Sequence, residues 1–323
     1  MDALSDVLKS IRLEGGVYVN VEFTAPFCVQ ANFGPVGVQM RMGGAEQVMH
    51  FHYILEGSCK LGGKDNEEVM VLNPGDLVLF LDEDPHLLAS DLRLPIVPSD
   101  SLIEQTDGNP GFIHMRHGGG GAMTRFVCGF LACKRSVCRP LLDALPTTLR
   151  IPVGDGPAAT MLRELLQLGV RESTSVKPGA ESMLAKLSEL MFVEAMRIHV
   201  ESMPPENLGW LAGVRDPHVG KALALMHAEP ARAWTVDELG KEVALSRSAL
   251  AERFTALVGE SPMQYLTRWR LALAAQMLKA GEAIVRVAES AGYESEAAFS
   301  RAFKREFGMP PAAWRKGEVG AQA

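Results

Sequence analysis

Short apolar runs separated by turn-forming residues dominate residues 17 to about 150. YVNVEF, VMHFHYIL, EVMVL, LVLFL and TRFVCGFLAC are such runs, and NPGD lies as a turn between two of them. Runs of this length between glycine and proline are typical of strands. We therefore predict an antiparallel barrel or sandwich. The glycines at 118–121 lack the helix and lysine that follow in a phosphate-binding loop, and they indicate a loop between strands.

Apolar residues take helical spacing after Pro157. AATMLRELLQLGVRES and ESMLAKLSELMFVEAMRIHVESM both show it, with the break SVKPGA between them. This pattern predicts an antiparallel helical hairpin, and one apolar stripe consists of Met183, Leu187, Leu190, Met191 and Ile198. The stripe fits equally well as cover for the sheet or as a dimer contact. The following segment, MPPENLGW, has the composition of a linker.

The overall composition is that of a soluble globular protein. The chain has 323 residues, of which 47% are hydrophobic and 22% charged, enough for two or three domains. We find no apolar run that would span a bilayer and no recognisable signal peptide. Five irregularly spaced cysteines favour free thiols in a reducing compartment. We therefore expect a cytoplasmic protein with no membrane partner.

Charge is distributed unevenly along the chain. The net charge of −7 alone would argue against a nucleic-acid partner. From Arg215 onward, however, 15 basic residues stand against 13 acidic ones, whereas the preceding part holds 17 basic and 26 acidic residues. The C-terminal part is therefore mildly basic and the N-terminal part acidic, an asymmetry compatible with a DNA-binding module at the C-terminus.

The C-terminal part contains an internal repeat. TVDELGKEVALSRSALAERFTALVGESPMQY and AIVRVAESAGYESEAAFSRAFKREFGMPPAAW keep their apolar residues in register. Leu239 matches Val287, and Ala244 matches Gly292. Each copy predicts a short helix, a tight turn and a second helix. The second helices begin at serine N-caps and end at glycines, namely Ser246, Ser295, Gly259 and Gly308.

This arrangement is that of a helix-turn-helix, whose second helix enters the DNA major groove. The segment PMQYLTRWRLALAAQMLKAG is long enough to form a rigid helix between the copies. Such a helix can hold two recognition helices about one DNA turn, ~34 Å, apart. A purely structural helical repeat is the alternative. It is disfavoured because the second helices expose small and charged faces that have no packing purpose.

Over residues 215–316 the chain resembles the AraC/XylS family of transcription regulators, whose signature is similar to GYESEAAFSRAFKREFGMPPAAWR. The resemblance implies binding to double-stranded promoter DNA. The DNA-facing positions that it implies are Arg247, Ser248, Ala251, Glu252, Glu296, Ala297, Ala298, Ser300 and Arg301.

The residue types at these positions predict different roles. The guanidinium fork of Arg301 matches O6 and N7 of guanine. Lys304 and Arg305, one turn further on, are placed for phosphates, which orient the protein without reading sequence. Glu252 either accepts a hydrogen bond from a cytosine amino group or stays outside the major groove. The alanines suit thymine methyl groups or simple accommodation of the DNA.

Two histidines and a glutamate share one strand face in GGAEQVMHFHYILEGSCKLGG. His50, His52 and Glu56 have the same parity, so an extended strand would direct all three into the barrel. The spacing G-x5-H-x-H-x3-E-x6-G resembles the first cupin motif. In the second cupin motif only Gly75 and His86 match. Three histidines and one carboxylate would suit an Fe, Mn, Ni or Zn ion with open coordination positions.

Alternatives to a metal site remain open for this strand. The same side chains can hydrogen-bond an organic effector or one another inside an apolar pocket. The AraC/XylS resemblance implies a cupin-like barrel that serves as an effector pocket, usually without metal. A metal-dependent cupin oxygenase or isomerase fused to a DNA-binding domain is the alternative from the enzyme class.

Three cysteines recur at every fifth residue, at Cys128, Cys133 and Cys138. This is not the spacing of a zinc site, and odd spacing on one strand would alternate the faces of the thiols. Free core cysteines are the ordinary interpretation. The alternative interpretation is that these cysteines sense oxidants and that their thiols are the reactive groups.

These patterns together predict an α+β protein and a transcriptional regulator rather than an enzyme. We expect a cupin-like sensor barrel over 1–156, a dimerising helical hairpin over 157–202, a linker over 203–214 and a double helix-turn-helix domain over 215–316. The barrel would sense a small-molecule, metal or redox signal. The expected partners are promoter DNA, a small-molecule effector, a second copy of the chain and, for an activator, RNA polymerase.

Overall fold

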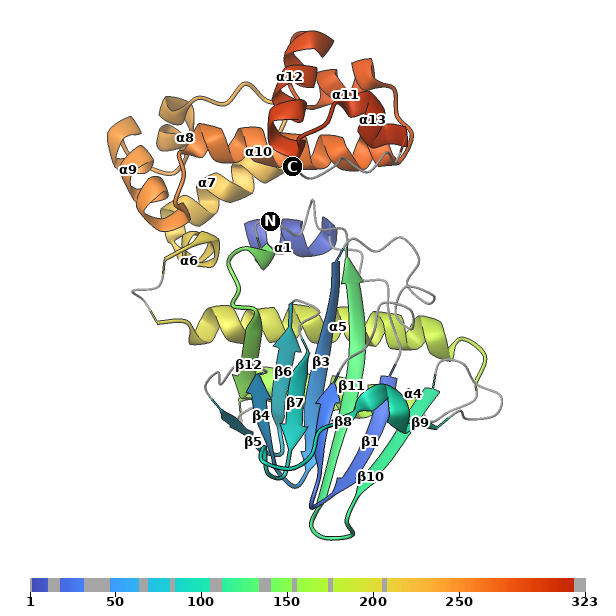
Figure 1. Ribbon diagram of the computed structural model, residues 1–323. Coiled ribbons are helices and arrows are strands. Elements are labelled where there is room, and N and C mark those ends of the chain that lie inside the picture. The colour runs from blue at the N-terminus through green and yellow to red at the C-terminus, as the bar shows by residue number, and fades with distance from the viewer. Residues whose placement is uncertain are drawn as a thin grey trace. The chain divides into compact units, whose positions relative to one another are not determined.

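The computed structural model describes residues 2–10, 18–31, 47–63, 69–81, 85–104, 112–133, 141–152, 156–173, 177–204 and 208–316 (Figure 1). The chain divides into two units. The barrel unit consists of residues 12–134 and 145–202, and the C-terminal unit of residues 1–11, 135–144 and 203–323. Among the residues described, no helix combines the length and apolar character that a membrane span requires.

Strands make up most of the barrel unit. They are β1 (Tyr18–Thr24), β2 (Cys28–Ala31), β3 (Gln47–Glu56), β4 (Cys59–Gly63), β5 (Met70–Leu72), β6 (Asp76–Phe80), β7 (His86–Ala89), β8 (Val97–Pro98), β9 (Ile103–Glu104), β10 (Phe112–Gly118), β11 (Met123–Cys133) and β12 (Thr148–Pro152), with the 3-10 helix η1 (Ser99–Leu102). They form a seven-stranded sheet in the order β12-β6-β3-β11-β1-β10-β9 and a five-stranded sheet in the order β5-β4-β7-β2-β8. The predicted barrel or sandwich is therefore confirmed.

Pairing within the sheets is mostly antiparallel, as predicted, but β1–β10 and β2–β8 are parallel pairs. The NPGD segment forms the predicted turn between β5 and β6. These two strands do not pair: β5 joins β4 in one sheet, and β6 joins β3 and β12 in the other. The turn is a corner between sheets, which a local sequence pattern cannot distinguish from a hairpin.

One hydrophobic core lies between the two sheets. It draws on alternate residues of strands from both sheets, among them Val21, Phe23, Ile54, Leu61, Leu72, Val78, Leu88 and Phe126. Every second side chain on each strand faces inward, because successive residues of a strand point to opposite sides. Burial of these apolar side chains provides the main stabilisation of the barrel unit.

The glycine-rich segment 118–121 turns between β10 and β11, as predicted. Gly118 has φ +128°, and a Cβ there would lie 1.8 Å from the carbonyl oxygen of Thr24. The amides of Gly119 and Gly121 donate to the carbonyls of Thr24 and Ala25. The glycines therefore permit a close backbone contact with the end of β1, and their amides are used within the fold.

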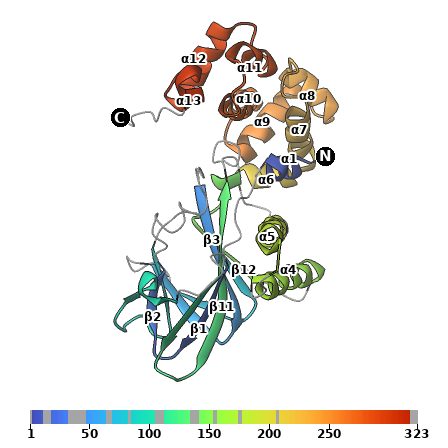
Figure 2. The same ribbon diagram turned by 90° about the vertical axis from the view of Figure 1, so that its right-hand side faces the viewer.

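Two helices, α4 (Pro157–Ser173) and α5 (Ala180–Ser202), form the predicted hairpin and contact β1 and β12 of the seven-stranded sheet (Figure 2). The predicted apolar stripe of α5 divides between two environments. Leu187 and Met191 are buried, whereas Met183 and Leu190 are 49% and 47% exposed. The hairpin therefore covers the sheet with one face and leaves apolar side chains on another.

The C-terminal unit is helical. Its helices are α1 (Ala3–Ser10), α6 (Trp210–Arg215), α7 (Pro217–Ala228), α8 (Val236–Glu242), α9 (Arg247–Val258), α10 (Pro262–Lys279), α11 (Ile284–Ser290), α12 (Glu296–Phe307) and α13 (Pro311–Lys316). Helix α1 packs against α6 and α7 within this unit and buries Ala3, Leu4, Val7 and Leu8. The first residues of the chain, assigned to the barrel from the sequence, thus belong to the other unit.

Helix α6 lies in the segment predicted as a linker. The indole of Trp210 is buried, and its Nε1 donates to the hydroxyl of Tyr265 at 2.8 Å. The same hydroxyl lies 2.7 Å from Nε2 of His227. Because the Trp210 nitrogen can only donate, the Tyr265 hydroxyl accepts from it and donates to His227. Burial lowers the pKa of His227 to about 3, so this imidazole is neutral and can accept.

The two repeats have the predicted helix ends. The hydroxyls of Ser246 and Ser295 each accept from the backbone amide three residues on, at 3.2 Å. Gly259 and Gly308 adopt left-handed conformations, with φ of 87° and 75°. The apolar residues of the second helices, Leu250, Phe254, Phe299 and Phe303, are fully buried. Local propensity and packing therefore agree in this unit.

The first repeat contains a strained residue where the second has a glycine. Ala244 has φ +58°, and its counterpart Gly292 has φ +74°. A side chain in this region is unfavourable because Cβ approaches the following carbonyl. We expect Ala244→Gly to raise the free energy of unfolding by roughly 0.5–1 kcal/mol, the relief of strain exceeding the added backbone entropy of the unfolded chain. All four tryptophans lie in the C-terminal unit, so urea unfolding followed by their fluorescence measures it.

Two comparison variants make this test specific. Ala256→Gly, at an exposed position inside α9, should lower the free energy of unfolding by about 1 kcal/mol. Gly292→Ala should also lower it, because the added Cβ would lie 3.2 Å from the carbonyl oxygen of Ala231. A loss of stability in Ala244→Gly similar to that in Ala256→Gly would contradict the assignment of strain to this turn.

Candidate metal centre and nucleic-acid interface

The central strand β3 places two histidines inside the barrel. It lies between β6 and β11, and its pairing aligns His50 with Phe80 and Phe130, and His52 with Val78 and Cys128. The predicted alternation holds over this part of β3. Both histidines are buried, with 6% and 0% of their surface exposed.

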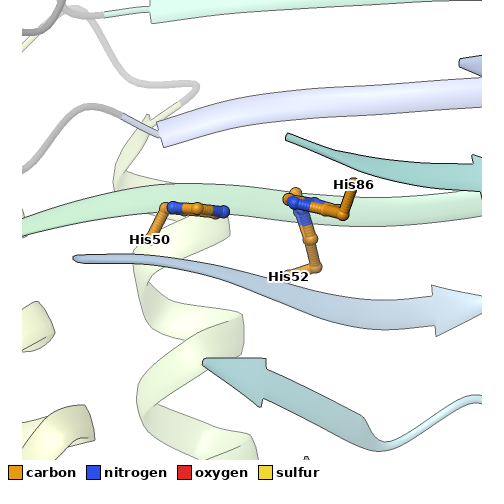
Figure 3. A group of neighbouring side chains, drawn as sticks. All are labelled: His50, His52 and His86. Carbon is orange, nitrogen blue, oxygen red and sulfur yellow. The ribbon is translucent and has the colours of Figure 1, made fainter. Parts of the chain in front are cut away.

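A third histidine reaches the same place from the other sheet. His86 is the first residue of β7, is 5% exposed, and lies beside the two β3 histidines (Figure 3). One nitrogen of each ring lies within 4.8 Å of the others. The closest pair is Nε2 of His52 and Nε2 of His86, at 2.7 Å. Three of the four ligands predicted from the sequence therefore come together.

The aromatic ring of Phe80 covers one side of this cluster. The His86 ring stacks on Phe80 with centroids 3.9 Å apart, and the His50 ring stacks on it at 4.6 Å. His50 and His86 differ by only 10° in ring plane, whereas His52 is tilted by 67° and 60° from them. His50 and His86 thus lie side by side under Phe80, with His52 meeting them at an angle. The sequence contains Phe80 in the run LVLFL but does not indicate this role.

Burial keeps the imidazoles of His50 and His52 neutral. Removal from water, reinforced by the neighbouring His86, lowers the pKa of His50 to about 3. The same two causes, and the proximity of His50, hold the pKa of His52 well below its usual value. A neutral imidazole offers one nitrogen lone pair, which is the form that binds a metal ion.

The fourth predicted ligand, Glu56, lies elsewhere. Its side chain is 54% exposed, and its Oε2 lies 2.6 Å from Nη2 of Arg125. The pairing of β3 with β11 shifts between Arg125, opposite Glu56, and Phe126, opposite Ile54. This bulge reverses the alternation of side chains beyond Ile54. The prediction that parity directs Glu56 into the barrel is therefore wrong.

The predicted redox cysteines are described only in part. Cys128 is 2% exposed, and its Sγ lies 2.7 Å from Nδ1 of His52. Burial raises its pKa well above the usual value, which opposes formation of a reactive thiolate. The side chain of Cys133, at the end of β11, and all of Cys138 lie outside the described residues. A link between Cys128 and a histidine was not predicted, because only the strand register creates it.

The histidine cluster fits a metal ion in its donor chemistry. Imidazole nitrogens are suitable ligands for Zn, Ni, Fe or Cu, and three protein ligands leave a position open. Metal–nitrogen bonds of about 2.0–2.1 Å require nitrogens more than ~3 Å apart. The 2.7 Å contact between His52 and His86 is a hydrogen bond, so these two rings must separate slightly when an ion enters.

The predicted DNA-facing side chains lie on the surface of the two second helices. On α9, Arg247, Ser248 and Glu252 are exposed and Ala251 is partly exposed. On α12, Glu296, Ala297, Arg301, Lys304 and Arg305 are exposed, and Ala298 and Ser300 are partly exposed. The opposite side of each helix packs into the unit, through Leu250 and Phe254 and through Phe299 and Phe303. Each helix therefore presents a polar face.

The two polar faces differ in the role of their arginines. Arg253 of α9 is bound to Asp216, the N-cap of α7, with a 2.8 Å hydrogen bond from Nε. This ion pair fixes α9 to α7. On α12, by contrast, Arg301, Lys304 and Arg305 follow one another at helical spacing. The second helix-turn-helix therefore carries the larger group of exposed cations.

Comparison with known proteins matches both units. A family model described as a cupin matches residues 2–201, and one described as a helix-turn-helix domain matches residues 239–317. An AraC-like transcription regulator of Streptomyces lividans is 34% identical over 318 residues, which is 98% of each chain. Another from Streptomyces antibioticus is 37% identical, covering 84% of this chain and 88% of that protein. The RCS-specific HTH-type transcriptional activator RclR of Escherichia coli is 30% identical, covering 98% of each.

Proposed function

Because this chain belongs to the AraC-like transcription regulators and combines a cupin domain with an AraC-type DNA-binding domain, we propose that its barrel senses a transition-metal ion. The ion would be held by His50, His52 and His86. Its binding would change how the C-terminal unit engages promoter DNA. This assigns sensing, rather than catalysis, to the cupin domain.

The observation that carries this proposal is the convergence of three buried imidazoles from two sheets. His50 and His52 come from the seven-stranded sheet and His86 from the five-stranded sheet. An ion bound to all three would link the sheets, and its binding free energy would stabilise the arrangement in which the nitrogens converge. The ion itself would supply charge and a fixed coordination geometry at this point.

The packing of the rings favours an ion over an organic effector at this point of the barrel. The rings of His50, His86 and Phe80 are in stacking contact, and Cys128 contacts the remaining ring. Three converging nitrogens can surround a single atom, whereas an organic molecule would have to separate these rings. A signal of this kind acts only if the ion binds one functional state of the protein more tightly than another.

Metal uptake by the full-length protein tests the sensor. After chelation and exposure to Zn, Ni, Mn or Fe, we expect about one ion per chain in the wild type and almost none in His52→Ala. His114→Ala is the matched control, because His114 lies on β10 of the same sheet beside Glu22 and outside the cluster. Elemental analysis measures the ion, and far-UV circular dichroism confirms that each variant is folded.

The regulatory part of the proposal has its own readout. Metal should alter the promoter footprint of the wild type and leave that of His52→Ala unchanged. Metal-dependent oxygen uptake without any effect on DNA binding would instead support the enzyme alternative. A wild type that retains none of the four metals would contradict metal sensing.

We further propose that α9 and α12 are the recognition helices and that the exposed residues named above face the major groove. The support is their position opposite the buried side of each helix and the cluster of cations on α12. Helix α10 has 18 residues and is therefore about 27 Å long, the same order as the ~34 Å between successive major grooves on one face of DNA.

Variants of α12 test this assignment. Arg301→Ala should weaken operator binding by about 1–3 kcal/mol and relax specificity at one base pair, because it removes a bidentate contact to a base. Lys304→Ala should weaken binding to all sequences and reduce the salt dependence by about one counterion. Arg93→Ala, which removes an exposed cation from the barrel unit, is the control. Unchanged affinity and footprint in Arg301→Ala would refute the placement.

The helical hairpin is our proposed dimer contact. Exposed apolar residues recur seven positions apart on both helices, as Met161 and Leu168 on α4 and as Met183 and Leu190 on α5. Such spacing places each pair on one helix face, where a second copy of the chain can cover it.

Substitution of one of these residues should change the oligomeric state. Leu190→Glu would place a charge in the contact, and we expect it to shift the protein from dimer to monomer in light scattering. Leu208→Glu alters another exposed leucine outside the hairpin and should remain dimeric. A wild type that is monomeric at micromolar concentration, or a dimeric Leu190→Glu protein, would exclude this contact.

A further inference from the structure

Both ring nitrogens of His52 are engaged. Nδ1 lies 2.7 Å from Sγ of Cys128, and Nε2 lies 2.7 Å from Nε2 of His86. The ring is wholly buried, so neither nitrogen exchanges its partner for water. A neutral imidazole has one N–H donor and one lone-pair acceptor. The hydrogen bond at Nδ1 therefore determines whether Nε2 carries a hydrogen or a lone pair.

Two arrangements of hydrogen satisfy these contacts. In the first, Nδ1–H of His52 donates to the sulfur of Cys128, and the Nε2 lone pair accepts the Nε2–H of His86. That hydrogen must move to Nδ1 of His86 before His86 can bind an ion through Nε2. In the second, the thiol donates to Nδ1, and Nε2 carries the hydrogen toward His86. Only the first leaves His52 able to bind a metal through Nε2, since a ligating histidine donates its other N–H to a neighbouring acceptor.

Strand pairing fixes the thiol in this position. Cys128 on β11 is directly opposite His52 on β3. Directly opposed side chains in an antiparallel pair have their Cβ atoms about 4.5–5.5 Å apart, close enough for a thiol to reach a ring nitrogen. The sulfur of Cys128 is a weak acceptor, but His52 is wholly buried and Cys128 nearly so, which removes this contact from solvent.

We propose that Cys128 is a positioning residue: its sulfur accepts Nδ1–H of His52 and directs the Nε2 lone pair toward the bound ion. The inference rests on the metal-sensing function proposed above. It gives the thiol a role that requires it to stay reduced, unlike the oxidant-sensing role that cysteine spacing suggested.

The tautomer of His52 can be measured without metal. Nitrogen-15 NMR of imidazole distinguishes a protonated ring nitrogen from one with a lone pair, and His52→Gln assigns the signals. We expect Nδ1–H in metal-free wild type and a mixture of tautomers, or mainly Nε2–H, in Cys128→Ala. Nε2–H in the wild type would overturn the proposal.

Metal affinity provides the second measurement, with Zn²⁺ as the probe and the full-length protein throughout. Cys128→Ala should bind Zn²⁺ about 10–100-fold more weakly than wild type, the usual effect of losing an outer partner of a ligating histidine. Cys128→Ser should recover most of this loss, because its hydroxyl can accept the same hydrogen bond. Cys59→Ala is the control: Cys59 is a buried thiol of the same core cluster and has no hydrogen bond to an imidazole among the described side chains.

The outcomes separate a positioning role from a packing role. If Cys128 only filled space, Cys128→Ser would bind no better than Cys128→Ala, and Cys59→Ala would lose affinity to a similar extent. Equal affinity in wild type and Cys128→Ala would overturn this inference alone. Absence of Zn²⁺ uptake by the wild type would overturn metal sensing and the role of Cys128 together.

Discussion

The pairing of β3 with both β6 and β11 is the constraint on which the histidine cluster depends. It fixes which side of β3 faces the core and sets His52 opposite Cys128. It also ends the regular alternation at the bulge after Ile54, so Glu56 pairs with Arg125 on the outside. A shift of the pairing by one residue would exchange the two faces and remove the histidines from the barrel.

Burial gives the cluster its chemical character. Imidazoles exposed to water would titrate near neutral pH, whereas the rings of His50 and His52 are held neutral by removal from solvent. Neutral rings in a closed core must satisfy their polar nitrogens with one another or with neighbouring side chains. The contacts of His52 with His86 and Cys128 are such a solution. An ion would replace part of this internal network with coordination.

The fold of the C-terminal unit depends mainly on interactions between residues close together in the chain. Its two repeats are specified by local signals, with serine caps, left-handed glycines and buried apolar positions in agreement. The repeats nevertheless differ in how they use the positively charged side chains of their second helices. Arg253 of the first is used to fix α9 to α7, whereas the second leaves its cations on the surface of α12. The surfaces of the two helices therefore differ in their available positive charge.

The sequence by itself determined the strand-rich region, the helical hairpin, the helix ends of the repeat and the shared face of His50 and His52, but not helices α1 and α6. These features depend on residues close together in the chain, for which periodicity and capping are sufficient signals. Only the tertiary structure decided that β5 and β6 enter different sheets, that α1 packs with the C-terminal helices, and that Phe80 and Cys128 contact the histidines. Each of these depends on the register or packing of segments distant in sequence, which no local pattern encodes.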